Sequence, residues 1–547
     1  MVNEAHIASY DPDIAWENSQ RAIDSAVKWA EEHGLKFSVS KTAVLFLTRK
    51  QGYKMPPPLK LYGEDIPYTH DCKYLGVTVD DKLSWHRHIN DKITSTKRIL
   101  MAAGSALAHA WGPKPKYMKW LYTSVIRPRI TYGAYVWAHA AEKGNLKQKL
   151  RSIQRLGLMM IAPIRKGTPT RAIEILYNVE PLHLHIRSLA LMTHLRVNPK
   201  ITWFPRNTTK VGHIMYAINK LPSQLENTSL DKVPYTRDWS NSNNVQIGDG
   251  NLNPNDSHRN YQADWTCFTD GSLLEERAGS GAIIYHGNEE FTLGECLKNA
   301  TVFQSELHAI EMAAIWLLER NPEFCTIQFY IDSQASLRAL KSIHNKSKTV
   351  AKARAALKCI STLNIVKLTW VEAHKGTEGN ELADKAANDA RKSDMEAIEL
   401  PLSLTTAKTI IKLEICREWQ NEWENYAEAR QSKYFLQGPD KKFATMTQYS
   451  RDTISQLIQF ITGHAFLKRH DCIIHYGNKD NTGDKECRLC NEEEETPHHI
   501  ITDCPVLMNL RLDIFHERFL PQYFRAWGIH QMVNYLNAAQ IQELLQQ

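Results

Sequence analysis

The chain has 547 residues, of which 43% are hydrophobic and 23% are charged. This is the composition of an ordinary globular protein of about three to five domains, and it excludes a wholly disordered or fibrous chain. The excess of 67 Lys and Arg over 60 Asp and Glu makes the chain mildly basic, which permits contact with nucleic acid but does not establish it.

The sequence pattern contains neither a membrane-spanning segment nor the layout of a secretory signal. No apolar run approaches the about 18 residues of a membrane-spanning helix, and the N-terminus lacks a basic region followed by an apolar one. The ten cysteines are scattered except for three near the C-terminus, a usage typical of a reducing compartment. We therefore expect an intracellular protein, nuclear or cytoplasmic rather than secreted, with no membrane partner.

In chain order, residues 1–200 have mostly helical periodicity, with short strand candidates at 43–48 and 74–79. Between residues 89 and 156, amphipathic helices carry many Lys and Arg side chains. A surface that follows a phosphate backbone and an ordinary solvated helix face explain this bias equally well. Residues 201–262 are expected to form an extended region that ends in a linker, because its second half is rich in Asn, Asp, Ser, Gly and Pro.

Residues 263–393 have a different pattern. Strand candidates cover 264–272, 280–286, 290–296, 325–331 and 366–371, and helical patterns cover 303–318, 333–343, 349–363 and 379–390. Three successive strands followed by alternating helices and strands predict a mixed five-stranded sheet with helices on both faces. Residues 394–547 are helix-rich. The sequence thus predicts a multidomain protein whose α/β domain is flanked by largely helical regions.

Four carboxylates of the α/β region stand where they can converge. Asp270 and Asp332 are expected at the ends of two strands, and Glu306 and Asp384 lie on two predicted helices. Four acids in one place repel, and burial raises their pKa values unless cations neutralise them. Hard oxygen ligands suit Mg²⁺ or Mn²⁺. Two such ions activate water and stabilise the leaving oxygen in phosphodiester hydrolysis.

Other polar residues adjoin these acids. His374 precedes the helix of Asp384 in a glycine-containing loop, which favours a role in proton transfer or product release. The candidate substrate-binding residues are Ser272, Ser305, Ser333 and Asn380. Each of these residues alone is more typical of a turn, a helix start or a solvated surface. Their order along the chain is what favours a site.

The blocks FTDGS, QSELHAI, YIDSQAS and WVEAHKGTEGNELADKAA, in this order, resemble the ribonuclease H family. The resemblance implies Asp270, Glu306, Asp332 and Asp384 as ligands of two Mg²⁺ (or Mn²⁺) ions and His374 as the loop histidine. It implies endonucleolytic hydrolysis of the RNA strand of RNA–DNA hybrids, in which 2′-hydroxyls distinguish RNA by shape. The chain departs from the family at residues 372–373, where Glu-Ala replaces a frequent Pro-Gly.

A second set of motif residues is spread over residues 13–195: Trp29, Gly34, Leu35, Ser40–Thr42, Tyr74–Val77, Leu83–Trp85, His88, Ile89, Leu121, Tyr122, Pro128, Tyr132, Gly133 and Trp137. In this order they resemble the end of a jockey-type non-LTR retrotransposon reverse transcriptase. The resemblance implies a truncated remnant over residues 1–200, comprising the end of the palm and thumb-like helices without the polymerase active site. Asp11 and Asp13 hint at the paired-aspartate turn, whereas Asp80 and Asp81 fall downstream and predict a surface turn.

A cysteine–histidine cluster lies at 487–504, with Cys487, Cys490, His499 and Cys504 in C-x₂-C-x₈-H-x₄-C spacing. Three thiolates and an imidazole suit one structural Zn²⁺ ion, with His498 as an alternative ligand and an unmetallated loop as the alternative structure. The cluster resembles the knuckle that ends many retroelement polyproteins. The four acids at 492–495 argue against phosphate contact by this module.

The sequence therefore predicts a retroelement-derived protein that acts as a metal-dependent ribonuclease H on RNA–DNA hybrids. The alternative is a catalytically inactive nucleic-acid-binding remnant, which the basic helices and the zinc knuckle would support. Residual polymerase activity within a larger complex is a third interpretation. The oligomeric state is left open by the sequence.

Overall fold

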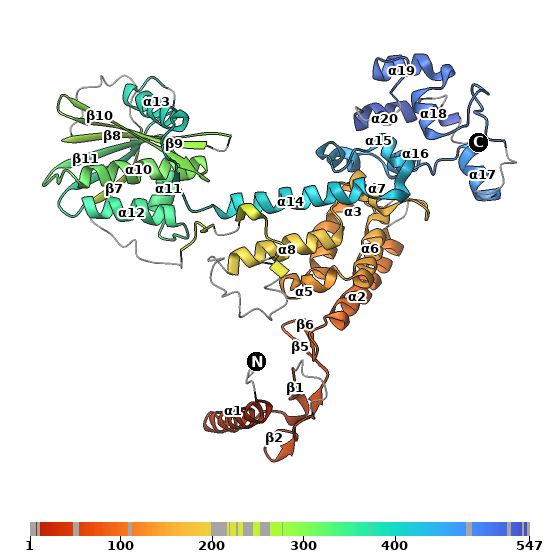
Figure 1. The fold of residues 1–547 in the computed structure, drawn as a ribbon, viewed down its shortest axis with the longest axis horizontal. Helices are drawn as coiled ribbons and strands as arrows, with labels where there is room; N and C mark the ends of the chain where they lie inside the picture. Colours follow the sequence, from red (N-terminus) through yellow and green to blue (C-terminus); the bar gives the residue numbers. More distant parts are fainter. Residues whose placement is uncertain are drawn as a thin grey trace. The chain divides into compact units, whose positions relative to one another are not determined.

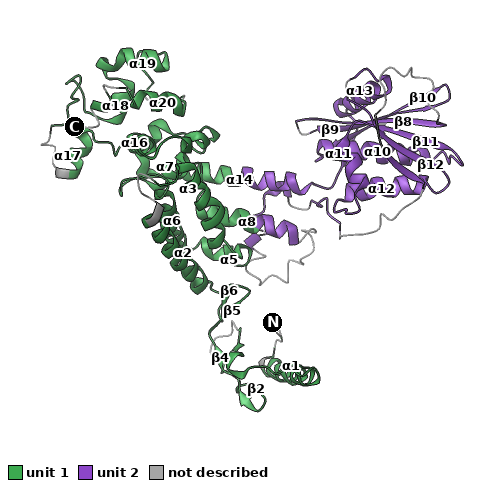
Figure 2. Cartoon of the chain, turned by 180° about the vertical axis from the view of Figure 1, so that it is seen from behind, with its two compact units in different colours: residues 1–190, 415–547 green, residues 191–414 purple. Residues whose placement is uncertain are grey.

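The computed structural model describes residues 7, 11–47, 54–107, 112–197, 216–217, 219–225, 228–233, 244–251, 263–275, 277–373, 375–476, 484–521, 524, 527–538 and 541–543. The chain forms two compact units (Figure 2), and the boundaries between them fall within helices α8 (Leu182–Val197) and α14 (Leu404–Glu424). Unit 1 comprises residues 1–190 and 415–547, and unit 2 comprises residues 191–414. Among the described residues, no helix has the length and apolarity needed to cross a membrane.

Unit 2 is built on a mixed sheet (Figure 1) that contains all five predicted strands: β8 (Trp265–Leu274), β9 (Arg277–His286), β10 (Glu289–Lys298), β11 (Thr326–Ile331) and β12 (Ile365–Trp370). Strands β8, β9 and β10 form the antiparallel meander, and β11 and β12 pair in parallel with β8 and with each other. The predicted mixed sheet with covering helices is therefore confirmed.

Within the described part of the chain the sheet has seven strands rather than the five predicted, in the order β13-β10-β9-β8-β11-β12-β7. Strand β7 (Val245–Asn251) pairs with β12, and the short β13 (Ile398–Glu399) pairs with β10. Strand β7 lies in the stretch that we expected to be a linker. The composition of this stretch is typical of turns, but apolar and polar residues alternate within it. Val245 and Ile247 are half-buried and pack against the core.

Helices cover both faces of this sheet: α10 (Val302–Leu318), α11 (Gln334–Lys341), α12 (Lys348–Ile360) and α13 (Glu378–Lys392). Because successive side chains of a strand point to opposite faces, Cys267 and Phe268 of β8 enter two different cores. Cys267 packs in the larger core with residues of α10 and α12, and Phe268 packs in the smaller core with Ala383 of α13.

Helix α13 approaches strand β9 closely because β9 carries glycines where the two cross. An added Cβ at Gly281 would lie 2.3 Å from Ala387 N and 2.4 Å from Ala383 O. An added Cβ at Gly279 would lie 2.1 Å from Ala387 O. Side chains at these positions would push the helix away from the sheet. The two glycines therefore fix the distance of α13 from the strands that carry the candidate site.

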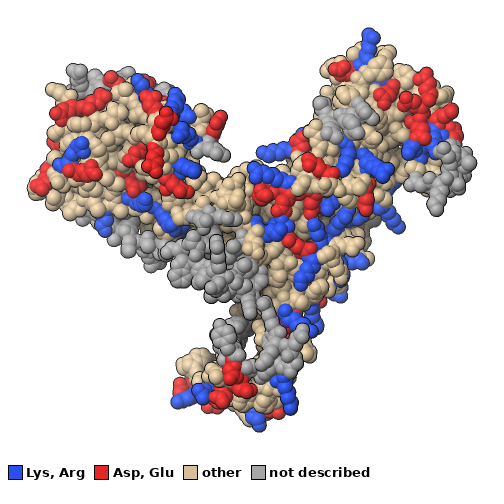
Figure 3. All heavy atoms as spheres, in the orientation of Figure 1, with Lys and Arg blue, Asp and Glu red and all other residues tan. Residues whose placement is uncertain are grey.

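Unit 2 also contains η4 (Ser223–Leu225). The first part of unit 1 contains α1 (Pro12–Glu32), η1 (Val39–Lys41), β1 (Val44–Leu45), β2 (Lys60–Leu61), β3 (Glu64–Asp65), β4 (Tyr68–Thr69), β5 (Asp71–Tyr74), β6 (Val77–Asp80), α2 (His86–Leu107), α3 (Pro115–Leu121), the π-helical turn η2 (Tyr122–Ile126), α4 (Arg127–Ile130), α5 (Ala134–Ala141), α6 (Gly144–Met159) and α7 (Thr170–Leu176). Figure 3 shows many Lys and Arg side chains over the helical part of unit 1 that contains α2 and α6.

The strand predicted at 74–79 is interrupted: Tyr74 ends β5 and residues 77–79 belong to β6, so the segment spans the tip of the β5–β6 hairpin. Leu75 and Gly76 adopt φ values of 43° and 81°, so the chain reverses between Tyr74 and Val77. The aspartates near the reverse-transcriptase-like motifs have local partners. Asp11 caps α1 by accepting from Asp13 N at 2.9 Å. Asp80 accepts from the backbone N–H groups of two residues that precede α2.

The second part of unit 1 contains η5 (Ala427–Ala429), α15 (Arg430–Phe435), η6 (Lys441–Gln448), α16 (Arg451–Ile461), α17 (Lys468–Tyr476), α18 (Pro497–Thr502), η7 (Pro505–Leu507), α19 (Met508–Phe515) and α20 (Ile529–Leu536). It packs with residues 1–190 rather than standing apart. The Arg451 guanidinium donates to the Met160 carbonyl at 3.1 Å, and Lys147 pairs with Glu422 at 2.8 Å. The N- and C-terminal regions, which look separate in the sequence, thus share one compact unit.

Candidate active site

Asp270 does not end its strand, contrary to the sequence-based prediction. Strand β8 continues to Leu274 in the hairpin with β9, where Asp270 faces Gly281. The parallel pairing of β8 with β11 ends one residue earlier, at Thr269 and Ile331. Asp270 therefore lies where the parallel part of the sheet ends, and Asp332 follows directly after β11. The Asp-Gly pair continues a strand here because β9 supplies its antiparallel partners.

Glu306 lies near the start of α10. Thr301 caps this helix and forms a capping box with Gln304, which fixes where the helix begins. Gly271 allows the close approach of β8, because an added Cβ would lie 2.5 Å from Glu306 N and from Ser305 Oγ. The first turns of α10 therefore pack directly against the strand residue that follows Asp270.

The structure brings three of the four predicted acids together. Asp270, Glu306 and Asp332 each offer a carboxylate oxygen, and these oxygens lie within 4.8 Å of one another. Burial and the charge of Asp332 raise the pKa of Asp270 to about 7. Burial and the charges of Asp332 and Asp270 raise the pKa of Glu306 to about 10. Such a cluster is electrostatically unfavourable when ionised and favours a bound cation.

Asp384, the fourth acid, lies outside this group of three. It is on α13, near enough for its charge to contribute to the raised pKa of Asp270. Its Oδ1 accepts from Asn388 Nδ2 at 2.8 Å, and the side-chain Oδ1 of Asn388 accepts from the Ser272 hydroxyl at 2.7 Å. Sequence reasoning missed Asn388. Its position one helical turn after Asp384 was the available signal.

The remaining predicted site residues have varied surroundings. His374 lies outside the described residues. Ser305 is fully buried and donates to Val302 O at 2.8 Å, so its hydroxyl serves the start of α10. Ser333 caps α11, and Asn380 donates to Asp332 Oδ2 at 3.4 Å. Ser272 and Ser333 are half-buried beside the acids.

A second ionisable cluster of unit 2 was not predicted. His308 lies on α10 two residues after Glu306, with Nε2 at 2.6 Å from Glu295 Oε2 and Nδ1 at 3.5 Å from Glu311 Oε2. Burial lowers the pKa of His308, but its bonds to the two glutamates outweigh burial and raise the pKa to about 9. The protonated ring therefore ties β10 to α10 at neutral pH.

The predicted cysteine–histidine cluster also converges. Cys487, Cys490, His499 and Cys504 each offer a ligand atom, and these atoms lie within 4.8 Å of one another. A hydrogen bond from Cys504 lowers the pKa of Cys487 to about 3, against burial, which raises it, and His499 acts in the lowering direction. His498 instead lies 3.6 Å from Asp503 and packs on Tyr434. Among the described residues, the histidine that lies with the three cysteines is therefore His499 and not His498.

The acidic run 492–495 is part of this module's internal structure. Glu493 Oε2 lies 3.1 Å from His499 Nδ1, which leaves Nε2 on the side of the sulfur atoms. Glu494 pairs with Arg469. Glu495 is fully buried and pairs with Arg488 at 2.6 Å. Three of the four acids therefore have structural partners, which the sequence reading of a charged loop did not anticipate.

Comparisons with known proteins agree with this architecture. Residues 262–392 match the family model described as RNase H. A protein named ribonuclease H from Francisella philomiragia is 30% identical over 137 residues, which cover 22% of this chain and 88% of that protein. The chain thus belongs to the ribonuclease H family.

Two proteins of Drosophila melanogaster are similar to a longer part of this chain. The putative 115 kDa protein in type-1 retrotransposable element R1DM is 29% identical over 180 residues, and the RNA-directed DNA polymerase from mobile element jockey is 28% identical over 186 residues. Each match covers 33% of this chain, but 17% and 19% of the respective relative, so the chain spans under a fifth of either. With the family match, these similarities support a non-LTR retrotransposon polyprotein that carries an RNase H domain, as predicted.

Proposed function

We propose that this chain hydrolyses the RNA strand of RNA–DNA hybrids, with two Mg²⁺ or Mn²⁺ ions held by Asp270, Glu306, Asp332 and Asp384. The observation that carries the proposal is the convergence of three buried or half-buried carboxylates within 4.8 Å, inside the region that matches the ribonuclease H model. The similarity to a protein named ribonuclease H supports the choice of substrate class.

The donor set fits hard divalent cations. All the proposed ligand atoms are carboxylate oxygens, and Glu306 Oε2 is buried without a hydrogen-bond partner among the described residues. Bound ions would supply Lewis acidity and an activated water at neutral pH. The chain itself supplies position: β8 and β11 hold Asp270 and Asp332 at one level of the sheet, and α10 adds Glu306 to them. Helix α13 carries Asp384 near enough for its charge to act on Asp270.

The half-buried hydroxyls of Ser272 and Ser333 are the proposed substrate contacts, with Asn380 orienting Asp332 from α13. We propose His374 as the loop histidine that transfers protons or aids product release, because it precedes α13 in the chain. Contacts to 2′-hydroxyls along the shallow groove of a hybrid require no base-specific readout.

The decisive experiment compares the parent chain with Asp332→Asn on a labelled RNA–DNA hybrid. We expect cleavage of the RNA strand that requires Mg²⁺ and that falls about a hundredfold or more in the variant, because a direct ligand contributes more than an outer-shell residue. The exposed Asp389→Asn on α13 is the matched control and should retain activity.

The competing interpretation is a remnant that binds nucleic acid without catalysis. An assay in two steps, with Ca²⁺ first and Mg²⁺ second, distinguishes it from the proposed ribonuclease. In Ca²⁺ the parent should bind the hybrid without cutting it, and addition of Mg²⁺ should then start cleavage. Binding that persists with no cleavage in Mg²⁺ or Mn²⁺ would favour the remnant. Equal cleavage by the parent and Asp332→Asn would contradict the proposed site.

We further propose one structural Zn²⁺ ion at Cys487, Cys490, His499 and Cys504. Three sulfur atoms and one imidazole form a set that zinc accepts, and Glu493 orients the imidazole through Nδ1. As a domain organisation, we propose residues 263–393 as the catalytic domain, residues 1–200 as derived from a reverse transcriptase, 201–262 as the connecting region and 394–547 as the region that bears the zinc knuckle.

A further inference from the structure

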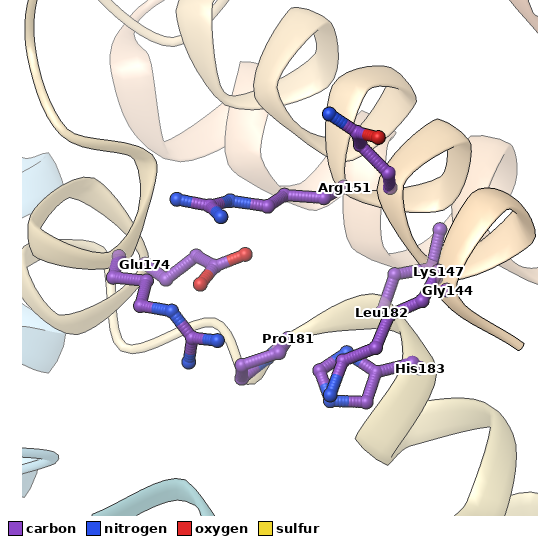
Figure 4. Close-up of a pocket in the computed structure, with 9 residues that line it drawn as sticks. Gly144, Lys147, Arg151, Glu174, Pro181, Leu182 and His183 are labelled. Atoms are coloured by element: carbon purple, nitrogen blue, oxygen red, sulfur yellow. The ribbon is translucent and has the colours of Figure 1, made fainter. Parts of the chain in front are cut away.

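Unit 1 contains a cavity of about 270 Å³ between α6, α7 and the start of α8. Its cationic lining residues are Lys147 and Arg151 of α6 and Arg171 of α7. Figure 4 shows Arg151 and Glu174 directed into the same space, with Lys147 and His183 on its other side. The proposed ribonuclease site, in unit 2, uses none of these residues.

Three of the basic side chains that line the cavity, Lys147, Arg171 and His183, bind the carboxylate of Glu422; we call these three residues and Arg151 the basic cluster. Glu422 of α14 accepts from Lys147 Nζ at 2.8 Å, from Arg171 Nη1 at 2.5 Å and from His183 Nε2 at 2.8 Å. Burial alone would raise the pKa of Glu422, but these hydrogen bonds hold the pKa well below its usual range. The geometry of the cluster therefore suits oxyanions.

Positive charge remains after Glu422 is counted. Arg151 donates to the Tyr426 hydroxyl at 2.9 Å and has no ion pair with a carboxylate among the described residues. The Nε atom of Arg171 is buried without a hydrogen-bond partner among the same residues. Glu174 carries only about half a negative charge at neutral pH, because burial raises its pKa to about 7 although the hydrogen bond from Gln154 at 2.6 Å acts in the opposite direction.

We propose that this cavity binds a phosphate group, either free orthophosphate or the phosphate of a small ester, between Arg151 and Arg171. Guanidinium groups bind phosphate oxygens through paired, charge-assisted hydrogen bonds. The size of the cavity, about 270 Å³, lies just below the range of common ligand pockets. It therefore fits a phosphate or a small ester better than a polynucleotide.

The test titrates inorganic phosphate, and separately ribose 5-phosphate, into the full chain and follows binding by calorimetry. We expect saturable binding that weakens tenfold or more in Arg151→Gln, because one charge-assisted hydrogen bond contributes about that factor. The matched control is Lys149→Gln, which removes the same charge from an exposed position on the same helix and should leave affinity within about twofold.

A second variant separates binding from structure. Glu422→Gln removes the carboxylate that competes for Lys147 and Arg171, so phosphate should bind several-fold more tightly even if the variant unfolds more easily. Absence of phosphate binding by the parent, equal weakening by Arg151→Gln and Lys149→Gln, or weaker binding by Glu422→Gln would each overturn the proposal. Tighter binding of ribose 5-phosphate than of orthophosphate would identify an ester as the ligand, and the reverse would identify free phosphate.

Discussion

Asp332→Asn should stabilise the metal-free sheet of unit 2 while it removes the response to Mg²⁺. The carboxylate oxygens of Asp332, Asp270 and Glu306 lie within 4.8 Å of one another. Two unit charges at that distance repel by about 3.5 kcal/mol at an effective dielectric constant of about 20. Asp332 is half-buried and therefore partly screened, so we expect a gain of about 1–2 kcal/mol in the free energy of unfolding.

The pH dependence of the parent has a defined direction. The pKa of Asp270 is about 7 in the folded state and about 4 in the unfolded state, because burial and Asp332 favour the protonated form. The carboxyl group of Asp270 therefore binds a proton more tightly in the folded state than in the unfolded state. Its contribution to the free energy of unfolding is fully present below about pH 4. That contribution is lost as the pH rises through about 7. Asp332→Asn should reduce this loss.

Hydrogen exchange of the full chain measures the effect locally, in peptides that cover β8 and β11. With a chelator present at pH 8, we expect exchange in Asp332→Asn to be slower than in the parent by a factor of about 5–30. Added Mg²⁺ should slow exchange in the parent and have little effect on the variant. The exposed Asp389→Asn should match the parent in both conditions. Faster exchange of metal-free Asp332→Asn, or equal protection by Mg²⁺, would refute the reasoning.

Three further perturbations test the packing, the second ionisable cluster and the zinc knuckle. Gly281→Ala should cost about 1–3 kcal/mol of unfolding free energy and speed exchange in α13, because its Cβ would meet the helix backbone. The control Gly104→Ala, inside α2, meets nothing within 4 Å and should not destabilise the chain, since Ala is favoured over Gly in a helix by up to about 1 kcal/mol. The stability that His308 contributes should be fully present below about pH 6.5 and lost as the pH rises through about 9. The free energy of unfolding of His308→Gln, measured between pH 6 and 10, should therefore depend less on pH than that of the parent. An unchanged pH profile would contradict this. Cys504→Ser should abolish retention of one zinc ion per chain, measured with a chromophoric chelator, whereas Cys416→Ser, exposed on α14, should retain the ion.

The α/β domain was largely predictable because its local signals agree with its tertiary structure. Strand periodicity located β8 to β12, and apolar helical faces located α10 and α13, since each element buries residues at the spacing of its own geometry. The reverse occurred at 74–79, where alternating residues suggested a strand. The positive φ values of Leu75 and Gly76 instead make this segment the tip of a hairpin, and residue alternation alone carries no information on such a reversal.

The sequence by itself determined the kind of chemistry, because it contains the carboxylates of the candidate site and the thiols and imidazole of the knuckle in a fixed order. Tertiary structure decided which of them converge: three acids form one tight group, and Asp384 stands outside it with Asn388 and Ser272 as partners. It also decided that β7 and β13 extend the sheet, that residues 415–547 pack with residues 1–190, and that Glu422 pairs with basic residues that line a cavity. These outcomes depend on contacts between residues far apart in the chain, and local periodicity does not encode the partner that such a residue meets.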